Sequence, residues 1–214
     1  MNIHEDRMRR FSDAGLYFVT SEILSEGRTT LKIVQAALSG GVRLIQLREK
    51  NLSVPRLLEL AGKIRKMTAE ADALLIINDR IDIALSVGAD GVHLGQDDLP
   101  VDAARRIAPD LIIGASSHTE EEACKAEAEG ASYVNIGPVF STKTKEWNNG
   151  FLGLDGVKSI APHISIPFTV MGGIKSHHVP ELRSAGAKTI ALVTAITAAP
   201  DPEKASKELL RLMQ

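Results

Sequence analysis

The sequence is poor in cysteine and aromatic residues, and it has no long apolar run. Its 214 residues include one cysteine, and 4% of them are aromatic. One cysteine cannot form an internal disulfide, which suits a reducing cytoplasm. No apolar run approaches the ~20 residues that a membrane-spanning helix needs. Residues 1–15 are charged and lack the apolar centre of a signal peptide. We therefore expect a cytoplasmic protein that does not bind a membrane.

An excess of charge of one sign is also missing. The chain has 25 Lys and Arg residues against 27 Asp and Glu residues, a formal net charge of -2. It contains no long block of like charges, so nothing indicates a nucleic-acid-binding surface. The length suits one globular domain. We expect small molecules, and no nucleic acid, as partners.

What the sequence does contain is a series of short apolar runs rich in Val, Ile and Leu. They span residues 16–20, 44–49, 74–79, 91–95, 111–116, 133–140, 168–173 and 189–194. Most are apolar through their whole length, which is typical of strands buried on both faces of a parallel sheet. The runs therefore predict eight parallel strands.

Helix signals lie between these runs. Residues 29–41 form a helical pattern that ends on two glycines, a common helix stop. Ser53 precedes a second helix with a proline in its first turn. Thr119 and Asp201 are expected to cap two further helices. One strand–helix unit then repeats every ~25 residues, a period typical of repeated architectures.

Eight such units predict an α/β fold of one particular kind. We expect a single-domain (β/α)8 TIM barrel over residues 1–214, with residues 1–15 as an N-terminal extension or helix. An open, doubly wound sheet is the alternative. No G-x-G-x-x-G motif follows the first run, which argues against a dinucleotide-binding version of that sheet. The barrel is the favoured interpretation.

Polar side chains gather where the predicted strands end, which is where a barrel of this kind places its site. They are Gln46, Arg48, Lys50, Asn78, Asp79, Gln96, Asp97, Asp98, Ser116, Ser117 and His118. Asp79 could instead cap the helix that follows it. His118 could simply pack beside the expected Thr119 cap. Their joint occurrence at the same end of the strands favours a functional site.

Two basic residues are predicted to face two acidic residues at this end. Alternation along the strand places Gln46, Arg48 and Lys50 on one face. Carboxylates suit Mg²⁺, which typically binds one or two of them together with substrate phosphates. Arg can bind a phosphate through two hydrogen bonds, and Lys supplies a point charge. The sequence therefore predicts that Asp79 and Asp98 bind Mg²⁺ and that the basic pair binds a pyrophosphate.

A second anion site is predicted at the ends of the last two strands. Gly172 and Gly173 end the seventh run, and Val193 and Thr194 end the eighth. Loops at these places in a barrel frequently bind a phosphate through backbone N–H groups. Together with the pyrophosphate site, this pattern indicates two phosphorylated substrates.

At these residues the chain resembles the thiamine-phosphate synthase family, and the likeness covers essentially the whole sequence. The matching stretches are QLREK (46–50), residues 77–98, residues 113–145, MGGI (171–174) and LVTAI (192–196). The resemblance implies a transferase that joins an aminopyrimidine methyl diphosphate to a thiazole ethyl phosphate and releases pyrophosphate.

The resemblance also implies roles for individual residues. The positions that would bind the pyrimidine diphosphate are Gln46, Arg48, Lys50, Asn78, Ser116 and Lys145. Those that would bind the thiazole phosphate are Thr142, Thr144, Gly173, Val193 and Thr194. Asp79 and Asp98 would bind Mg²⁺. The chain departs from the usual family pattern at Asn135, Ser141 and Thr194, so its affinity for the thiazole could differ.

The charges suggest how such a reaction proceeds. Arg48, Lys50 and Lys145, together with Mg²⁺, would stabilise the departing pyrophosphate by preorganised charge. We expect a largely dissociative step followed by attack of the thiazole nitrogen. Lys145 could alternatively form a Schiff base, as in some barrel aldolases, but its place in a loop beyond the strand favours phosphate contact.

Two other functions remain as alternatives. One is a thiazole tautomerase of the same superfamily, with His118 as a candidate base. The other is a non-catalytic protein that binds a thiamine precursor. Neither needs the basic and acidic residues that the chain contains together, so the synthase is favoured.

Overall fold

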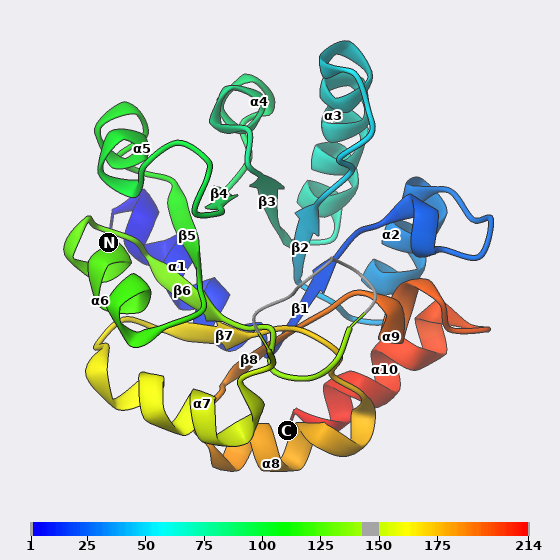
Figure 1. Cartoon of the computed structure of the whole chain (residues 1–214). Coiled ribbons are helices and arrows are strands. Elements are labelled where there is room, and N and C mark those ends of the chain that lie inside the picture. Colours follow the sequence, from blue (N-terminus) through cyan, green and yellow to red (C-terminus); the bar gives the residue numbers. More distant parts are fainter. Residues whose placement is uncertain (1, 143–149, 214) are drawn as a thin grey trace.

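The structure is a computed structural model that describes residues 2–142 and 150–213. Within these residues eight parallel strands close into a barrel in chain order (Figure 1). The strands are β1 (Leu16–Val19), β2 (Leu44–Leu47), β3 (Leu74–Asn78), β4 (Gly91–Leu94), β5 (Ile112–Ser117), β6 (Tyr133–Ile136), β7 (Phe168–Val170) and β8 (Thr189–Leu192). The register of β1 against β8 pairs Tyr17 with Ala191, which closes the ring. The predicted (β/α)8 TIM barrel is confirmed.

Helices follow the strands and surround the barrel (Figure 1). They are α1 (Ile3–Asp13), α2 (Thr30–Ser39), α3 (Val54–Glu70), α4 (Ile81–Val87), α5 (Val101–Ile107), α6 (Glu120–Ala128), α7 (Gly153–Ile160), α8 (Val179–Ser184), α9 (Thr194–Thr197) and α10 (Pro202–Leu212). Short 3-10 helices span Glu22–Leu24, Ala161–His163 and Ser176–His178. In the part of the chain that the structure describes, no helix is both long and apolar enough to cross a membrane.

The predicted helix boundaries have identifiable causes. The Thr119 side chain accepts a hydrogen bond from the Glu122 amide at the start of α6, and the Asp201 side chain caps α10 in the same way. Each cap satisfies an amide that has no partner within the helix. Ser53 precedes α3 as predicted, but its side chain forms no capping bond. Gly41 adopts a φ of 97° just after α2, a conformation that favours glycine at the end of a helix.

Apolar side chains form two cores, one inside the barrel and one around it. Tyr17 and Val19 point inward and join the inner cluster, whereas Leu16 and Phe18 point outward and pack with the helices. This alternation follows from the two-residue period of a strand. Both faces are buried, so the strands are apolar throughout, as the sequence indicated. Each fully buried large side chain contributes roughly 1.5–3 kcal/mol to stability.

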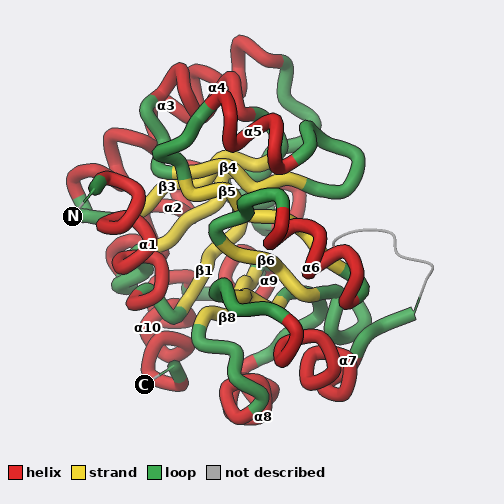
Figure 2. Tube along the Cα trace, turned by 90° about the vertical axis from the view of Figure 1, so that its left-hand side faces the viewer, coloured by secondary structure: helices red, strands yellow, loops and turns green. Residues whose placement is uncertain are grey.

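Helix α1 covers the end of the barrel at which the strands begin (Figure 2). The Phe11 ring packs against the Tyr133 ring, with 4.4 Å between the centroids. The Arg7 and Arg10 guanidinium groups donate to the backbone carbonyls of Asp110 and Asp72, which lie just before β5 and β3. These contacts close one end of the barrel, and the opposite end carries the cavity.

Candidate functional site

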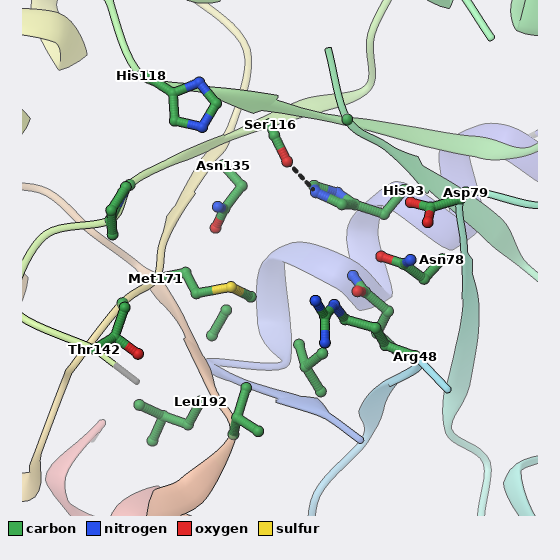
Figure 3. A pocket seen from close by; sticks show the side chains of 18 of the residues that line it. Arg48, Asn78, Asp79, His93, Ser116, His118, Asn135, Thr142, Met171 and Leu192 are labelled. Carbon is green, nitrogen blue, oxygen red and sulfur yellow. Dashed lines mark hydrogen bonds between the residues drawn. The ribbon is translucent and has the colours of Figure 1, made fainter. Parts of the chain in front are cut away.

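A cavity of about 440 Å³ opens at the carboxyl ends of the strands. Its volume is in the range that small-molecule sites occupy. The predicted site residues in the described part of the chain all line it: Gln46, Arg48, Lys50, Asn78, Asp79, Asp98, Ser116, Thr142, Gly173, Val193 and Thr194. Figure 3 shows several of these side chains pointing into the same space from different strands. Thr144 and Lys145 lie outside the described residues.

Arg48 and Lys50 bring positive charge to this cavity directly after β2. The Arg48 amide donates to the Thr20 hydroxyl at 2.9 Å, which fixes the backbone where β2 ends. Burial lowers the pKa of Arg48, and the nearby Asp79 opposes that shift. The Lys50 ammonium lies 3.5 Å from a carboxylate oxygen of Asp79. An arginine that is partly withdrawn from water binds an anion more strongly than a fully hydrated one.

Asp79 and Asp98 meet at the neighbouring strand ends. Asp79 adopts a φ of 60°, and its amide donates to the His93 carbonyl at 2.8 Å. Asp98 reaches back through its turn, where its carboxylate accepts from the Gly95 amide at 2.7 Å. Burial, and then the hydrogen bond and negative charge of Asp98, raise the pKa of the Asp79 carboxyl. A like charge this close disfavours ionisation of the Asp79 carboxyl.

The structure decides between the two interpretations of Asp79. Helix α4 begins at Ile81, with Arg80 at the capping position and no side-chain cap. Asp79 therefore does not cap this helix. Its left-handed backbone, which a non-glycine residue adopts at a cost, directs the side chain toward the cavity instead. The backbone conformation of Asp79 thus agrees with the interpretation in which its side chain faces the cavity and does not cap a helix.

A metal ion would depend on this carboxylate pair and on the ligand. In the described ranges, no group of three or more His, Cys, Asp or Glu side chains converges as a metal site. Mg²⁺ commonly uses one or two carboxylates and takes its remaining ligands from water and substrate phosphates. Asp79 and Asp98 fit that donor set, because they are two adjacent hard oxygen donors beside the positive charge that would hold a phosphate.

His93 is a functional candidate that the sequence prediction missed. It lies in the middle of β4, lines the cavity, and hydrogen-bonds Ser116 Oγ through Nε2 at 3.0 Å (Figure 3). Burial lowers its pKa to about 4, so the imidazole is neutral at pH 7. The available signal was a single polar residue inside an apolar run, at a position that alternation directs into the barrel.

The polar groups of His118 and Ser117 form hydrogen bonds within the chain. The His118 side chain lines the cavity, and its Nδ1 lies 2.8 Å from a Glu122 oxygen in α6. Its backbone amide donates to the same oxygen at 2.7 Å. Ser117 is fully buried and donates to the Asn135 carbonyl at 3.3 Å. Ser117 therefore lies outside the cavity, on the face of β5 opposite to that of Ser116.

The loops after β6 and β7 form the wall opposite the carboxylates. The Phe140 amide donates to the Gly172 carbonyl at 3.0 Å, which joins the two loops. Gly173 adopts a φ of 61°, and a Cβ atom there would lie 2.2 Å from the Ser141 carbonyl oxygen. Only glycine permits this approach. Thr142 lines the cavity from the same wall.

The backbone beyond β8 turns directly into α9, at the edge of the same cavity. The Val193 carbonyl accepts from the amides of Ile196 and Thr197 at 3.0 Å. The Arg28 guanidinium donates to the Thr197 carbonyl at 2.9 Å and thereby holds the far end of this short helix. Val193 and Thr194 are therefore fixed in place, as an anion-binding turn requires.

One family departure has a clear structural setting. Asn135 lines the cavity, and its Oδ1 accepts a hydrogen bond of 2.8 Å from the Thr169 hydroxyl. The pairing satisfies both polar groups inside the barrel, as buried polar groups require. Asn135 thus adds a polar side chain to the cavity wall, with a partner on β7.

The chain is similar to known proteins in both sequence and fold. A family model described as thiamine monophosphate synthase matches residues 16–196. A thiamine-phosphate synthase of Archaeoglobus fulgidus is 44% identical over 208 residues, which are 97% of each chain. One of Chloroflexus aurantiacus is 43% identical over 201 residues, covering 94% of this chain and 93% of the relative. A solved thiamine phosphate pyrophosphorylase from Pyrococcus furiosus has a TM-score of 0.87 at 38% identity and covers 96% of this chain and 97% of its own.

Proposed function

This chain belongs to the thiamine monophosphate synthase family, and from that premise we propose that it is a thiamine-phosphate synthase. It is a transferase that joins an aminopyrimidine methyl diphosphate to a thiazole ethyl phosphate and releases pyrophosphate. The observation that carries the proposal is the set of Arg48, Lys50, Asp79 and Asp98 around one cavity. This set matches a substrate that carries a diphosphate.

Mg²⁺ is the cation that fits the two carboxylates. Asp79 and Asp98 would hold it, because each already presents an oxygen to the space that the other faces. When bound, it would stabilise negative charge on the diphosphate as a Lewis acid. Burial, and then the neighbouring Asp98, raise the pKa of the Asp79 carboxyl, and a bound cation would oppose both effects.

Arg48 and Lys50 stabilise the departing pyrophosphate. Arg48 is held by its backbone at the end of β2 and can bind two phosphate oxygens at once. Lys50 supplies a second charge from the same face. Lys145 is expected to add a third. Because the aminopyrimidine spreads the positive charge left on its carbon, a dissociative step followed by attack of the thiazole nitrogen requires no covalent enzyme intermediate.

The remaining residues form two binding regions. Gln46, Asn78 and Ser116 contact the pyrimidine diphosphate on the side of β2, β3 and β5. The thiazole phosphate lies against the opposite wall, where Thr142, Gly173, Val193 and Thr194 bind it. Thr144, outside the described residues, is expected to contribute as well. Backbone amides carry much of this second site, because the wall is built from tight turns. The cytoplasmic location and the absence of nucleic-acid binding stay predictions.

The test is direct synthesis by the purified protein. With both phosphorylated substrates and Mg²⁺, we expect thiamine phosphate and an equal amount of pyrophosphate. Omitting the thiazole phosphate should prevent formation of thiamine phosphate, and EDTA should stop the reaction. A tautomerase would change the thiazole alone, without Mg²⁺ or diphosphate. Absence of thiamine phosphate under conditions where both substrates bind would contradict the proposal.

A further inference from the structure

A chain of hydrogen bonds runs below the cavity from Gln46 to Ser116. Gln46 Nε2 donates to the Tyr17 hydroxyl at 2.6 Å. The Tyr17 hydroxyl lies 2.9 Å from that of Tyr133, which lies 2.9 Å from His93 Nδ1. His93 Nε2 then lies 3.0 Å from Ser116 Oγ. The five residues belong to β2, β1, β6, β4 and β5, so the chain crosses the whole interior of the barrel.

The three central groups are buried and held by their surroundings. Tyr17 is 1% exposed, Tyr133 0% and His93 6%. Gly114 makes room for the Tyr133 ring, because a Cβ atom at this position would lie 2.2 Å from the ring carbon Cζ. Phe11 of α1 packs on the other side of that ring. The hydroxyl groups therefore have no access to bulk water, and each must bond to its neighbour in the chain.

With Gln46 Nε2 as the first donor, every buried hydroxyl in the chain finds a partner for its hydrogen in one direction of donation. Tyr17 accepts from Gln46 and so uses its own hydrogen to donate to Tyr133. Tyr133 in turn donates to His93 Nδ1, which must then carry no proton. The proton of the neutral imidazole is left on Nε2, which donates to Ser116. Ser116 therefore accepts from within the barrel, and its own hydroxyl hydrogen is available to the cavity.

The same direction sets the chemistry of Gln46. One Nε2 hydrogen is used by Tyr17, which holds the amide with Oε1 and the second Nε2 hydrogen left for other partners. In the described part of the chain, no partner bonds to this oxygen. Gln46 and Ser116 both line the cavity. The held Gln46 amide thus presents its Oε1 acceptor, and Ser116 its hydroxyl donor, to a ligand that offers the opposite groups.

We propose that Tyr17, Tyr133 and His93 are positioning residues that select a ligand with a donor facing Gln46 and an acceptor facing Ser116. The inference rests on the proposed function, in which the ligand is an aminopyrimidine diphosphate. Its exocyclic amino group supplies the donor, and a ring nitrogen or a diphosphate oxygen supplies the acceptor. A ring with a carbonyl in place of the amino group loses the bond to Gln46 Oε1 and is expected to bind less tightly.

The first test reads the proton position directly and needs no ligand. Nitrogen-15 NMR of histidine-labelled wild-type protein should show His93 as neutral, with its proton on Nε2. The His93→Gln variant identifies the signal by its loss. In Tyr133→Phe, Nδ1 loses its donor, and we expect averaging of the two tautomers. A proton on Nδ1 in the wild type would overturn the proposal, whether or not the protein makes thiamine phosphate.

The second test measures binding and is compared with a matched control. Tyr133→Phe should weaken binding of the pyrimidine diphosphate about tenfold while leaving the KM of the thiazole phosphate unchanged. Ser206→Ala is the control, because it also removes a buried hydroxyl, one that bonds the Pro202 carbonyl at 2.7 Å in α10. Tyr17→Phe breaks the same chain one step earlier and replaces Tyr133→Phe if that variant does not fold. Equal affinities in Ser206→Ala and the folded tyrosine variant would contradict the positioning role.

Discussion

The two ends of the barrel place acidic residues in opposite electrostatic settings. At the closed end, the Asp90 carboxylate lies 2.6 Å from the Arg65 guanidinium and 3.4 Å from that of Arg7. It also accepts from the Leu75 amide at 2.8 Å. At the open end, Asp79 faces the Asp98 carboxylate, and it forms an ion pair at 3.5 Å with the half-exposed Lys50.

This difference separates stability from function. A buried carboxylate costs free energy unless cations and hydrogen bonds surround it. The closed end meets that requirement within the chain itself, because α1 and α3 supply the arginines. The open end does not, and there a ligand or metal would complete the charge balance. We therefore expect that substitutions at the closed end change stability and that substitutions at the open end change activity.

The largest effect is expected from Asp79→Asn. Loss of one carboxylate should lower kcat/KM on the order of 100-fold, because the cation that balances the leaving group is no longer held. A raised carboxyl pKa means that ionisation is less favourable in the folded chain than in the unfolded chain. At pH 7, which is above the ordinary pKa of a carboxyl group, the ionised Asp79 carboxylate therefore lowers the stability of the folded chain. Thermal melting should show an unchanged or higher Tm, and a large fall in Tm would contradict this.

Asp90→Asn is the matched change at the closed end. It leaves Arg65 and Arg7 without their carboxylate partner, and we expect a loss of about 3 kcal/mol in the free energy of unfolding. For a chain of this length, that corresponds to a Tm lower by roughly 6–12 °C. Below the new melting transition, kcat/KM should stay close to the wild-type value. A loss of activity as large as that of Asp79→Asn would remove the distinction between the ends.

Lys50→Ala tests the cationic side of the open end. One charge-assisted contact to the diphosphate is lost, so the KM for the pyrimidine substrate should rise about tenfold. The KM for the thiazole phosphate should change little, because its wall lies across the cavity. Steady-state kinetics with each substrate varied in turn gives both values. An effect confined to the thiazole phosphate would reverse the assignment of the two regions.

The smallest effect is expected from Thr194→Val. The hydroxyl is lost, but the backbone amides of the turn after β8 remain in place, held by the contacts of Arg28. We expect the KM of the thiazole phosphate to rise by only a few-fold, on the order of one neutral hydrogen bond. Arg28→Ala sharpens the test, since it releases the turn itself. A smaller effect from Arg28→Ala than from Thr194→Val would show that the backbone carries little of this site.

The sequence predicted the strands well because their burial on both faces leaves a continuous apolar signal. The predicted runs were too long where apolar residues continue into loops: the sixth run was expected to reach Phe140, whereas β6 ends at Ile136. The meeting of Asp79 with Asp98 was also predictable, because the ends of neighbouring parallel strands adjoin.

The interior hydrogen-bond chain could not be predicted in the same way. The Tyr17 and Tyr133 hydroxyls bond across 116 positions of sequence, and each tyrosine lies in a run that also reads as simple apolar core. Their pairing depends on closure of the barrel and on the space beside Gly114. The sequence marked His93 only as a polar residue inside an apolar run, and its partners Tyr133 and Ser116 come from other strands. Local patterns indicate which residues are buried, but not which buried polar groups meet.

The central claim is that Asp79 and Asp98 form a site for a divalent cation that holds a diphosphate. Calorimetric titration of pyrophosphate, with and without Mg²⁺, into the wild type and into Asp98→Asn tests it most directly. Association of Mg²⁺ with pyrophosphate in solution is the same in both experiments, so the difference isolates the carboxylate. We predict that Mg²⁺ increases the affinity of the wild type at least tenfold and that of Asp98→Asn far less. An equal increase in the two proteins would contradict the account.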